Sequence, residues 1–300
     1  DEIAVLEMGI SDFGEMTRLA QIARPDTCVI TNIGTCHLEN LGDRDGVLKA
    51  KTEIFQSMKP NGHIVLNGDD DKLITVREYN GVKPVFFGLN SERDVYADQI
   101  ESKGLKGVAC RIHLGEDAFD VLVPTPGIHM VYNALAAAAV GRIYGLTIEE
   151  IRRGIESLET IRGRFKMIET DKFLVVDDCY NANPMSMKAS LDVLHDGEGR
   201  RVAILGDMGE LGEDEAALHE GVGIHAAICG IDACVCVGDL AVHIAEAARK
   251  ANPDFPVYYE KTRESLLEHL NDYVQKGDTI LVKASHFMKF EEVVKALEEM

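Results

Sequence analysis

The sequence lacks the features of several large classes of protein. Its 7 cysteines are an odd number and include no C-x-x-C pair, which argues against a disulfide framework or a zinc site. Lys and Arg total 31 against 51 Asp and Glu, and the formal net charge of -20 argues against nucleic-acid binding, which needs clustered cations. No apolar run approaches the ~20 residues that a membrane-spanning helix requires. We therefore expect a cytoplasmic protein with reduced, mostly buried thiols. The cysteines are Cys28, Cys36, Cys110, Cys179, Cys229, Cys234 and Cys236.

The length and the order of the expected elements favour two α/β domains. A chain of 300 residues exceeds the ~100–200 typical of one domain. After a junction at Gly163, Arg164 and Phe165, apolar strands and amphipathic helices alternate regularly, which is the signature of a doubly wound parallel sheet. We assign residues 1–160 to a first domain and residues 161–300 to a second, Rossmann-like domain. The strands expected in the second domain are 173–176, 201–205, 233–237, 257–259 and 279–283, and the helices are 184–195, 213–229, 240–251, 262–275 and 289–299.

The first domain is expected to combine a parallel sheet with a small antiparallel section. A helix over residues 128–144 is apolar nearly all round, which predicts that it is buried together with His129 and Asn133 on one of its faces. A later helix begins at Thr147, and Glu150 completes a capping box. The strands expected here are 2–6, 27–33, 64–66, 85–87, 95–100, 108–114 and 121–123, and the helices are 14–23, 43–58, 128–144 and 147–158.

A first candidate site lies in residues 173–187, FLVVDDCYNANPMSM. Asp177 and Asp178 follow a buried strand, and Asn181 and Asn183 lie in the turn before the next helix. Ligands of open α/β sheets bind outside the carboxyl ends of the strands, so these carboxylates and amides favour a polar ligand. The alternative is that they only form turns and helix caps.

A second candidate site joins Glu7, His37 and Lys51. Glu7 and His37 each fall just past an expected strand, and Lys51 lies in the middle of the apolar face of the helix over residues 43–58. A lysine is rarely buried without a partner, so an inward-pointing Lys51 near a carboxylate and an imidazole indicates a chemical role. A structural His37 and a Lys51 that extends to the surface are the alternatives.

Seven motifs occur in a fixed order along nearly the whole chain. They are E-M-G at 7–9, T-N-I-G-x-x-H at 31–37, A-K at 50–51, G-x-H-x-x-x-N-A-L-A-A-A at 127–138, G-R at 163–164, D-D-x-Y-N-A-N-P-x-S-M at 177–187 and L-G-D-M-x-E-L-G at 205–212. This order and spacing resembles the Mur ligase family of ATP-dependent peptide ligases. The last two motifs are most similar to the members that add D-Ala-D-Ala to UDP-MurNAc-tripeptide. The resemblance implies a P-loop-type central ATPase domain followed by a Rossmann-like ligase domain, in a monomeric cytoplasmic enzyme.

The resemblance also implies roles in the first domain. Glu7 and His37 match magnesium ligands of the family. Lys51 matches a lysine that is carbamylated in several members, where the carbamate oxygens help to hold a second Mg²⁺, and we expect Lys51 and His37 to serve catalysis as well. Asn133 matches the adenine-binding asparagine.

In the second domain, the resemblance makes Arg164 a contact of the ATP phosphates and Asp178 a contact of the ribose. Asn181, Asn183 and Ser285 lie in motifs that border the incoming amino substrate. Lys283 is expected to be catalytic. The implied reaction transfers the γ-phosphate of ATP to the carboxylate of the tripeptide, and the amine of D-Ala-D-Ala then attacks the acyl phosphate.

Three departures from the family pattern stand out. No Walker A string, G-x-x-G-K-[ST], occurs in the sequence, and the chain opens on Asp1 rather than Met. We therefore expect that the natural start and the domain that binds the sugar nucleotide are missing, and that the chain alone folds but is inactive. Met130 replaces the family's usual Asn, and His286 replaces a permanently charged Arg. The alternatives are another amide ligase of the superfamily, such as folylpolyglutamate synthetase, and a non-catalytic nucleotide-binding or scaffold protein.

Overall fold

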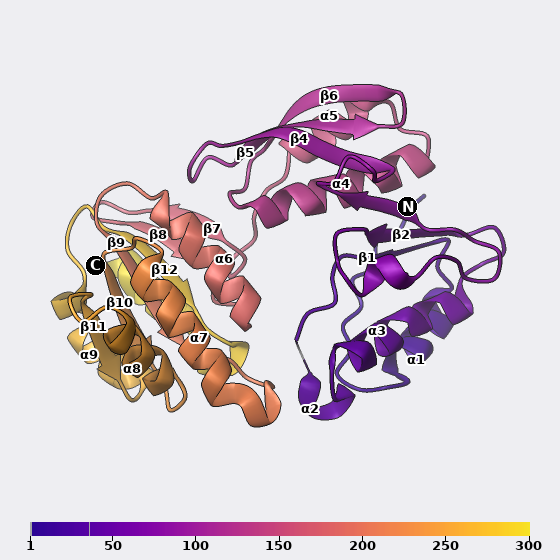
Figure 1. Ribbon diagram of the computed structural model, residues 1–300. Helices are drawn as coiled ribbons and strands as arrows, with labels where there is room; N and C mark the ends of the chain where they lie inside the picture. The colour runs from indigo at the N-terminus through magenta and orange to yellow at the C-terminus, as the bar shows by residue number, and fades with distance from the viewer. Residues whose placement is uncertain (1, 36) are drawn as a thin grey trace. The chain divides into compact units, whose positions relative to one another are not determined.

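The computed structural model describes residues 2–35 and 37–300, and this part of the chain divides into two compact units (Figure 1). The N-terminal unit runs to Glu101 and includes Val108–Val123 and Ile128–Ser157. The C-terminal unit consists of Ser102–Gly107, Pro124–Gly127 and Leu158–Met300. Each unit is built on a six-stranded sheet of the described residues, which confirms the expected α/β class. No helix among the described residues is long and apolar enough to span a membrane.

The sheet of the N-terminal unit has its strands in sequence order, from β1 to β6. β1, β2, β3 and β4 pair in parallel, whereas β5 and β6 form the expected antiparallel section. The strands are β1 (Thr27–Ile30), β2 (His63–Asn67), β3 (Val85–Gly88), β4 (Val95–Ser102), β5 (Val108–Leu114) and β6 (Asp117–Val123). The α-helices are α1 (Glu15–Ala23), α2 (Leu38–Leu41), α3 (Arg44–Thr52), α4 (Ile128–Ile143) and α5 (Ile148–Glu156), with 3₁₀ turns η1 (Glu53–Ser57) and η2 (Leu73–Thr75).

Two predictions for this unit were wrong. Residues 2–6 form no strand, and Ile3, Val5 and Leu6 are 57%, 92% and 61% exposed, because nothing in the described chain pairs with this segment or covers it. Helix α4 is not buried all round, since Ala134, Leu135 and Ala138 belong to the core while His129 and Asn133 are exposed. The helix expected over residues 43–58 changes from α to 3₁₀ geometry after Thr52.

The C-terminal unit is the expected doubly wound sheet, with the strand order β11-β10-β9-β12-β8-β7. All neighbours pair in parallel except β7 and β8, which are antiparallel. The edge strand β7 was not expected, because its four residues alternate between half-buried and exposed and give only a weak apolar signal. The strands are β7 (Lys166–Glu169), β8 (Leu174–Asp177), β9 (Arg201–Gly206), β10 (Ala233–Val237), β11 (Val257–Glu260) and β12 (Thr279–Lys283). The helices are α6 (Pro184–His195), α7 (Glu215–Ile228), α8 (Ala241–Ala251), α9 (Arg263–Tyr273) and α10 (Glu291–Glu299), with 3₁₀ turns η3 (Gly212–Asp214) and η4 (His286–Met288).

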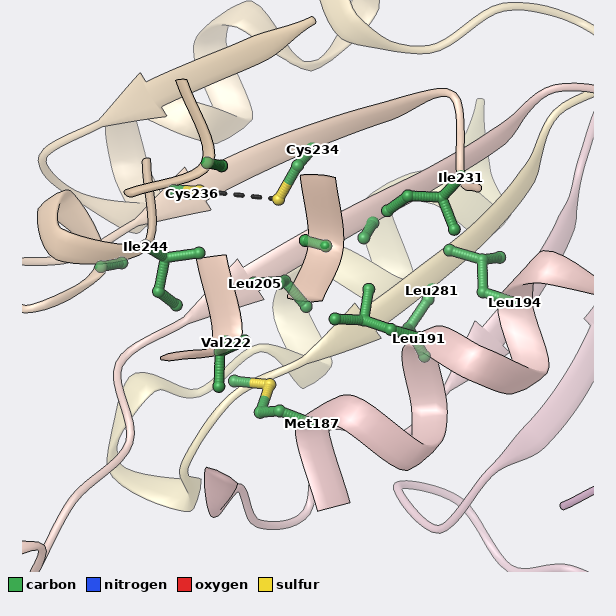
Figure 2. Close-up of a cluster of buried hydrophobic side chains, with 14 of the residues drawn as sticks. Met187, Leu191, Leu194, Leu205, Val222, Ile231, Cys234, Cys236, Ile244 and Leu281 are labelled. Atoms are coloured by element: carbon green, nitrogen blue, oxygen red, sulfur yellow. Dashed lines mark hydrogen bonds between the residues drawn. The ribbon is translucent and has the colours of Figure 1, made fainter. Parts of the chain in front are cut away.

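Alternate residues of the central strands enter two separate cores, one on each face of this sheet. Cys234 and Cys236 of β10 join side chains of α6, α7 and α8 on one face (Figure 2). Val235 of β10 joins side chains of α9 and α10 on the other face. A parallel sheet covered on both faces needs apolar residues at nearly every position, and β10 and β12 are buried throughout.

The cysteines that the structure describes are free thiols, as expected. Burial raises the pKa of Cys28 to about 12 and that of Cys110 to about 11, so both stay protonated near neutral pH. Cys179 is 4% exposed, and burial together with its hydrogen bond to Asp177 raises its pKa above the usual range, which argues against a nucleophile. Cys36 lies outside the described residues.

Candidate active site

The carboxyl ends of β8, β12 and β9 lie side by side in the C-terminal unit. The chain passes from β8 to β9 through α6, and β12 enters the sheet between them, so the direction of strand addition reverses here. Such a reversal is where open α/β sheets bind ligands. Asp177 and Asp178 lie at the end of β8, Lys283 ends β12, and Asp207 follows β9.

A buried ion pair joins the ends of β12 and β8. The ammonium Nζ of Lys283 donates to Asp178 Oδ2 at 2.6 Å and to the carbonyl oxygen of Asn181 at 3.1 Å. Ser190 Oγ donates to the same carboxylate oxygen at 2.7 Å. The Lys283 side chain is 3% exposed and that of Asp178 is 15% exposed. Lys283 therefore fixes the loop that carries the predicted substrate contacts, and it lies largely shielded from solvent.

The two adjacent aspartates also hold the segment around Arg164. Asp177 Oδ2 accepts a hydrogen bond from the backbone N–H of Gly163 at 2.8 Å, and Asp178 Oδ1 accepts one from the N–H of Phe165 at 3.2 Å. Gly163 and Phe165 are buried, whereas Arg164 between them is exposed. The guanidinium of Arg164 lies 4.4 Å from the centre of the Tyr180 ring. Thus the structure brings Arg164 and Asp178, two of the predicted nucleotide contacts, to the same end of β8.

The predicted substrate contacts Asn181 and Asn183 lie in the loop between β8 and α6. Asn183 is the N-cap of α6, and its side chain forms a capping box with Ser186. The side-chain oxygen of the exposed Asn181 accepts from the N–H of Ala182 at 2.8 Å. Asn181 and Asn183 therefore do form a turn and a helix cap, and these contacts hold both amides at the end of the sheet.

Ser285 connects two loops at this end of the sheet. Its hydroxyl oxygen accepts from the N–H of Gly209 at 2.9 Å and lies 3.4 Å from the carbonyl oxygen of Ala182, to which it donates. Ser285 is 4% exposed. In this position Ser285 orders the loops after β8 and β9.

Asp207 and His219 also belong to this end of the sheet, although neither was predicted as a site residue. Asp207 Oδ1 accepts from the N–H groups of Leu240 and Ala241 at 3.0 and 2.7 Å, and burial raises its pKa. His219 is fully buried in α7, and its Nε2 accepts from the N–H of Met208 at 2.9 Å. Its Nδ1 therefore carries the proton, and burial lowers the pKa of His219. The L-G-D-M motif directly after a strand was the available signal for Asp207.

In the N-terminal unit, Lys51 points toward the carboxyl end of β1. Its Nζ donates to the carbonyl oxygen of Asn32 at 2.9 Å, and its side chain is half-buried. Two residues that were not predicted for the site hold the neighbouring Ile33. Its N–H donates to Asp70 at 2.8 Å, and its carbonyl oxygen accepts from Arg44 at 3.0 Å. The loop that leads to His37 is thereby anchored.

The remaining predicted residues of this unit lie on its surface or close to it. Glu7 is exposed, and His37 is the half-buried N-cap of α2, with a φ of 58°. Asn133 is exposed on α4, and its Nδ2 lies 3.4 Å from Met130 Sδ. Met130 therefore contacts the predicted adenine-binding asparagine directly.

The predicted magnesium ligands Glu7, His37 and Lys51 would hold the ion only together with the phosphates of a nucleotide. Among the described residues, no group of three or more His, Cys, Asp or Glu side chains could hold a metal. A nucleotide-bound Mg²⁺ takes only one or two protein ligands, because water and phosphate oxygens complete its shell. Glu7 offers a carboxylate, His37 an imidazole, and a carbamylated Lys51 would add hard oxygen atoms.

Two family models match this sequence in consecutive segments. The Mur ligase middle domain matches residues 1–141, and the Mur ligase, glutamate ligase domain matches residues 163–286. The chain belongs to the Mur ligase family.

Three relatives illustrate its place among the Mur ligases. The UDP-N-acetylmuramoyl-tripeptide–D-alanyl-D-alanine ligase of Bacillus subtilis (strain 168) is 37% identical over an alignment of 301 positions, which covers 99% of this chain and 65% of that protein. The crystal structure of MurF from Acinetobacter baumannii is 32% identical, with a TM-score of 0.89 over 98% of this chain and 64% of that one. MurF from Thermotoga maritima, solved in complex with ADP, is 27% identical, with a TM-score of 0.82 over 96% of this chain and 65% of that one. This Mur ligase sequence thus spans about 65% of the length of its curated relatives.

The Mur ligase match confirms the resemblance drawn from the seven motifs. The two matched segments leave residues 142–162 between them, which contain α5 and the loop that precedes Gly163. The second match begins at Gly163, and the N–H of this glycine donates the hydrogen bond to Asp177.

Proposed function

We propose that this Mur ligase is the ATP-dependent enzyme that joins D-Ala-D-Ala to UDP-MurNAc-tripeptide in the synthesis of peptidoglycan precursors. The observation that carries the proposal is the 37% identity, across 99% of this chain, to a relative named for that reaction. The solved structures named MurF, with TM-scores up to 0.89, support the proposal through similarity of fold as well. We assign residues 1–160 to the central ATP-binding domain and residues 161–300 to the ligase domain.

In this proposal the N-terminal unit binds the adenine and the metal. Asn133, exposed on α4, would contact the base. Glu7, His37 and Lys51 would hold Mg²⁺ together with the phosphates of ATP. The ion would neutralise the charge that develops on the transferred phosphoryl group. Lys51, whose Nζ already lies at the carboxyl end of β1, would orient this site through its amine or its carbamate.

The C-terminal unit would supply the phosphate, ribose and amino-substrate contacts. Arg164 would contact the phosphates and Asp178 the ribose. Asn181, Asn183 and Ser285 would border D-Ala-D-Ala, and their hydrogen bonds to the backbone hold the loop in place. Lys283 would contribute to catalysis by holding Asp178 and the carbonyl of Asn181, because its ammonium is bonded to both.

The reaction requires activation because a carboxylate is a poor acyl donor. A carboxylate oxygen of the tripeptide takes the γ-phosphoryl group of ATP, which gives an acyl phosphate and ADP. The amine of D-Ala-D-Ala attacks the acyl carbon and loses a proton, and phosphate leaves as the amide forms. The protein contributes mainly by positioning the reactants and neutralising charge.

The test is phosphate release by the full-length protein with ATP, UDP-MurNAc-tripeptide and D-Ala-D-Ala. We expect release only when all three are present, and formation of the pentapeptide product. Release with a folate and glutamate instead would identify a folylpolyglutamate synthetase. ATP binding without release under any of these conditions would favour a non-catalytic protein and refute the proposal.

A further inference from the structure

Several hydrogen bonds fix the backbone of the turn that carries the exposed Arg164. The N–H groups on both sides of Arg164 donate to Asp177 and Asp178, and the N–H of Tyr180 donates to the carbonyl oxygen of Gly163 at 2.9 Å. Gly163 has a φ of 78°, and a Cβ atom there would lie 3.1 Å from the Cβ of Tyr180. Only glycine suits this backbone conformation and this close approach without strain.

The backbone of Phe165 is also unusual. It has a φ of 54°, which is rare for a bulky residue, although its side chain is only 7% exposed. A conformation of this kind costs free energy and persists when surrounding contacts determine it. Here those contacts include the hydrogen bond to Asp178, which Lys283 and Ser190 hold in place.

Tyr180 completes the arrangement by contacting the Arg164 side chain. Tyr180 is 49% exposed, and the centre of its ring lies 4.4 Å from the guanidinium carbon and 5.6 Å from the centre of the His286 ring. An aromatic ring engages the face of a guanidinium, whereas phosphates and carboxylates are recognised by its N–H edge. The two interactions therefore do not compete, and stacking restricts the rotamers of a long, flexible side chain.

We propose that Tyr180 and Asp177 are positioning residues for Arg164, which they hold ready to bind an oxyanion. Asp177 fixes the backbone of the turn, and the Tyr180 ring orients the guanidinium. The hydroxyl of Tyr180 has no part in this role. Because the anion is the ATP phosphate of the proposed function, this inference rests on that proposal.

The experiment compares Tyr180→Phe, Tyr180→Ala, Arg164→Ala and the double variant Tyr180→Ala/Arg164→Ala in the full-length enzyme. We expect Tyr180→Phe to keep the wild-type KM for ATP and kcat. Tyr180→Ala should lower kcat/KM for ATP by about fivefold, the size of a lost exposed cation–π contact. The double variant should be no worse than Arg164→Ala, because Tyr180 acts only through Arg164. Losses that multiply in the double variant, or a Tyr180→Phe as impaired as Tyr180→Ala, would overturn the inference.

A control and a second readout keep the inference separate from the proposed function. Tyr258→Ala removes a comparably exposed tyrosine, whose ring centre lies 5.0 Å from that of Tyr273, and should leave kcat/KM unchanged. In NMR spectra, the Arg164 Nε–H signal should show a ring-current shift that Tyr180→Phe keeps and Tyr180→Ala removes. This readout needs no ligase activity, so it judges the stacking even if the wild type fails to ligate. An unshifted Arg164 signal in the wild type would contradict the inference.

For Asp177→Ala we expect faster amide exchange at Gly163, and unchanged exchange there would show that Asp177 does not fix the turn.

Discussion

The ammonium of Lys283 and the carboxylate of Asp178 lie 2.6 Å apart at the end of the C-terminal sheet, although their positions in the sequence differ by 105. Removing one member of a buried ion pair leaves the other charge without compensation. We expect Lys283→Met to lower the free energy of unfolding of the C-terminal unit by about 3–5 kcal/mol, measured by urea denaturation. Lys295→Met is the matched control, because its pair with Glu299 is largely exposed and should contribute at most about 1 kcal/mol. Equal losses in the free energy of unfolding in the two variants would show that the Lys283–Asp178 pair does not act as a buried ion pair.

Substitution of Lys51 should affect turnover more than folding. Its side chain is half-buried and donates to the carbonyl oxygen of Asn32 at 2.9 Å, beside the proposed metal site. We expect Lys51→Ala to lower kcat of the full-length enzyme by about 10²–10³-fold and short carboxylates to restore part of it. Lys49→Ala, which removes a neighbouring lysine that lies over the Phe13 ring, should keep near-normal kcat. Wild-type turnover of Lys51→Ala would refute the role.

Asn183 combines a helix cap with a proposed contact to D-Ala-D-Ala, and two substitutions separate these roles. Asn183→Ser keeps an N-cap oxygen for α6 but removes the amide, so it should raise KM for D-Ala-D-Ala with little change in Tm. Asn183→Ala should raise the same KM and also destabilise the protein by about 1 kcal/mol. KM for ATP should change little in both variants. A rise confined to KM for ATP would place the dipeptide site elsewhere.

His219 should make the stability of the C-terminal unit depend on pH. Burial lowers its pKa below the ordinary 6.5, so as the pH falls the unfolded chain takes up this proton before the folded one. The contribution to stability is therefore complete above pH 6.5 and is lost as the pH falls from 6.5 through the lower folded pKa. We expect His219→Gln to weaken the pH dependence of the free energy of unfolding below pH 6.5, measured by urea denaturation at several pH values. His225→Gln, which removes a more exposed histidine paired with Asp192, should leave the contribution of His219 in place. A profile that His219→Gln does not change would show that His219 is not its source.

Local chemistry made much of the fold predictable from the sequence. The sequence predicts the capping box of Thr147 and Glu150 at the start of α5, and Pro184 begins α6 as expected. Strand β10 was predicted with its observed bounds, because an unbroken apolar run between helical patterns has few other interpretations. These signals depend on neighbours in the sequence.

The contacts that build the candidate site were less predictable because they join distant segments. The pairing of Lys283 with Asp178 depends on β12 lying next to β8, and spacing along the sequence does not determine strand order. The stacking of Arg164 on Tyr180 depends on a turn at Gly163 whose positive φ leaves no periodic pattern. The apolar residues 2–6 gave a strand signal, but a strand also needs a partner, which the sequence does not reveal.

The carboxylate of Asp207 changes what the C-terminal fold can bind. Dinucleotide-binding proteins of similar architecture seat a pyrophosphate on the N–H groups at the start of a helix. Here Asp207 already accepts from the N–H groups of Leu240 and Ala241 at the start of α8. A Cβ atom at Gly238 would lie 2.3 Å from the same carboxylate, so no space remains beside it. The carboxyl group of Asp207 already occupies the start of this helix, so we expect no dinucleotide phosphate to bind at α8.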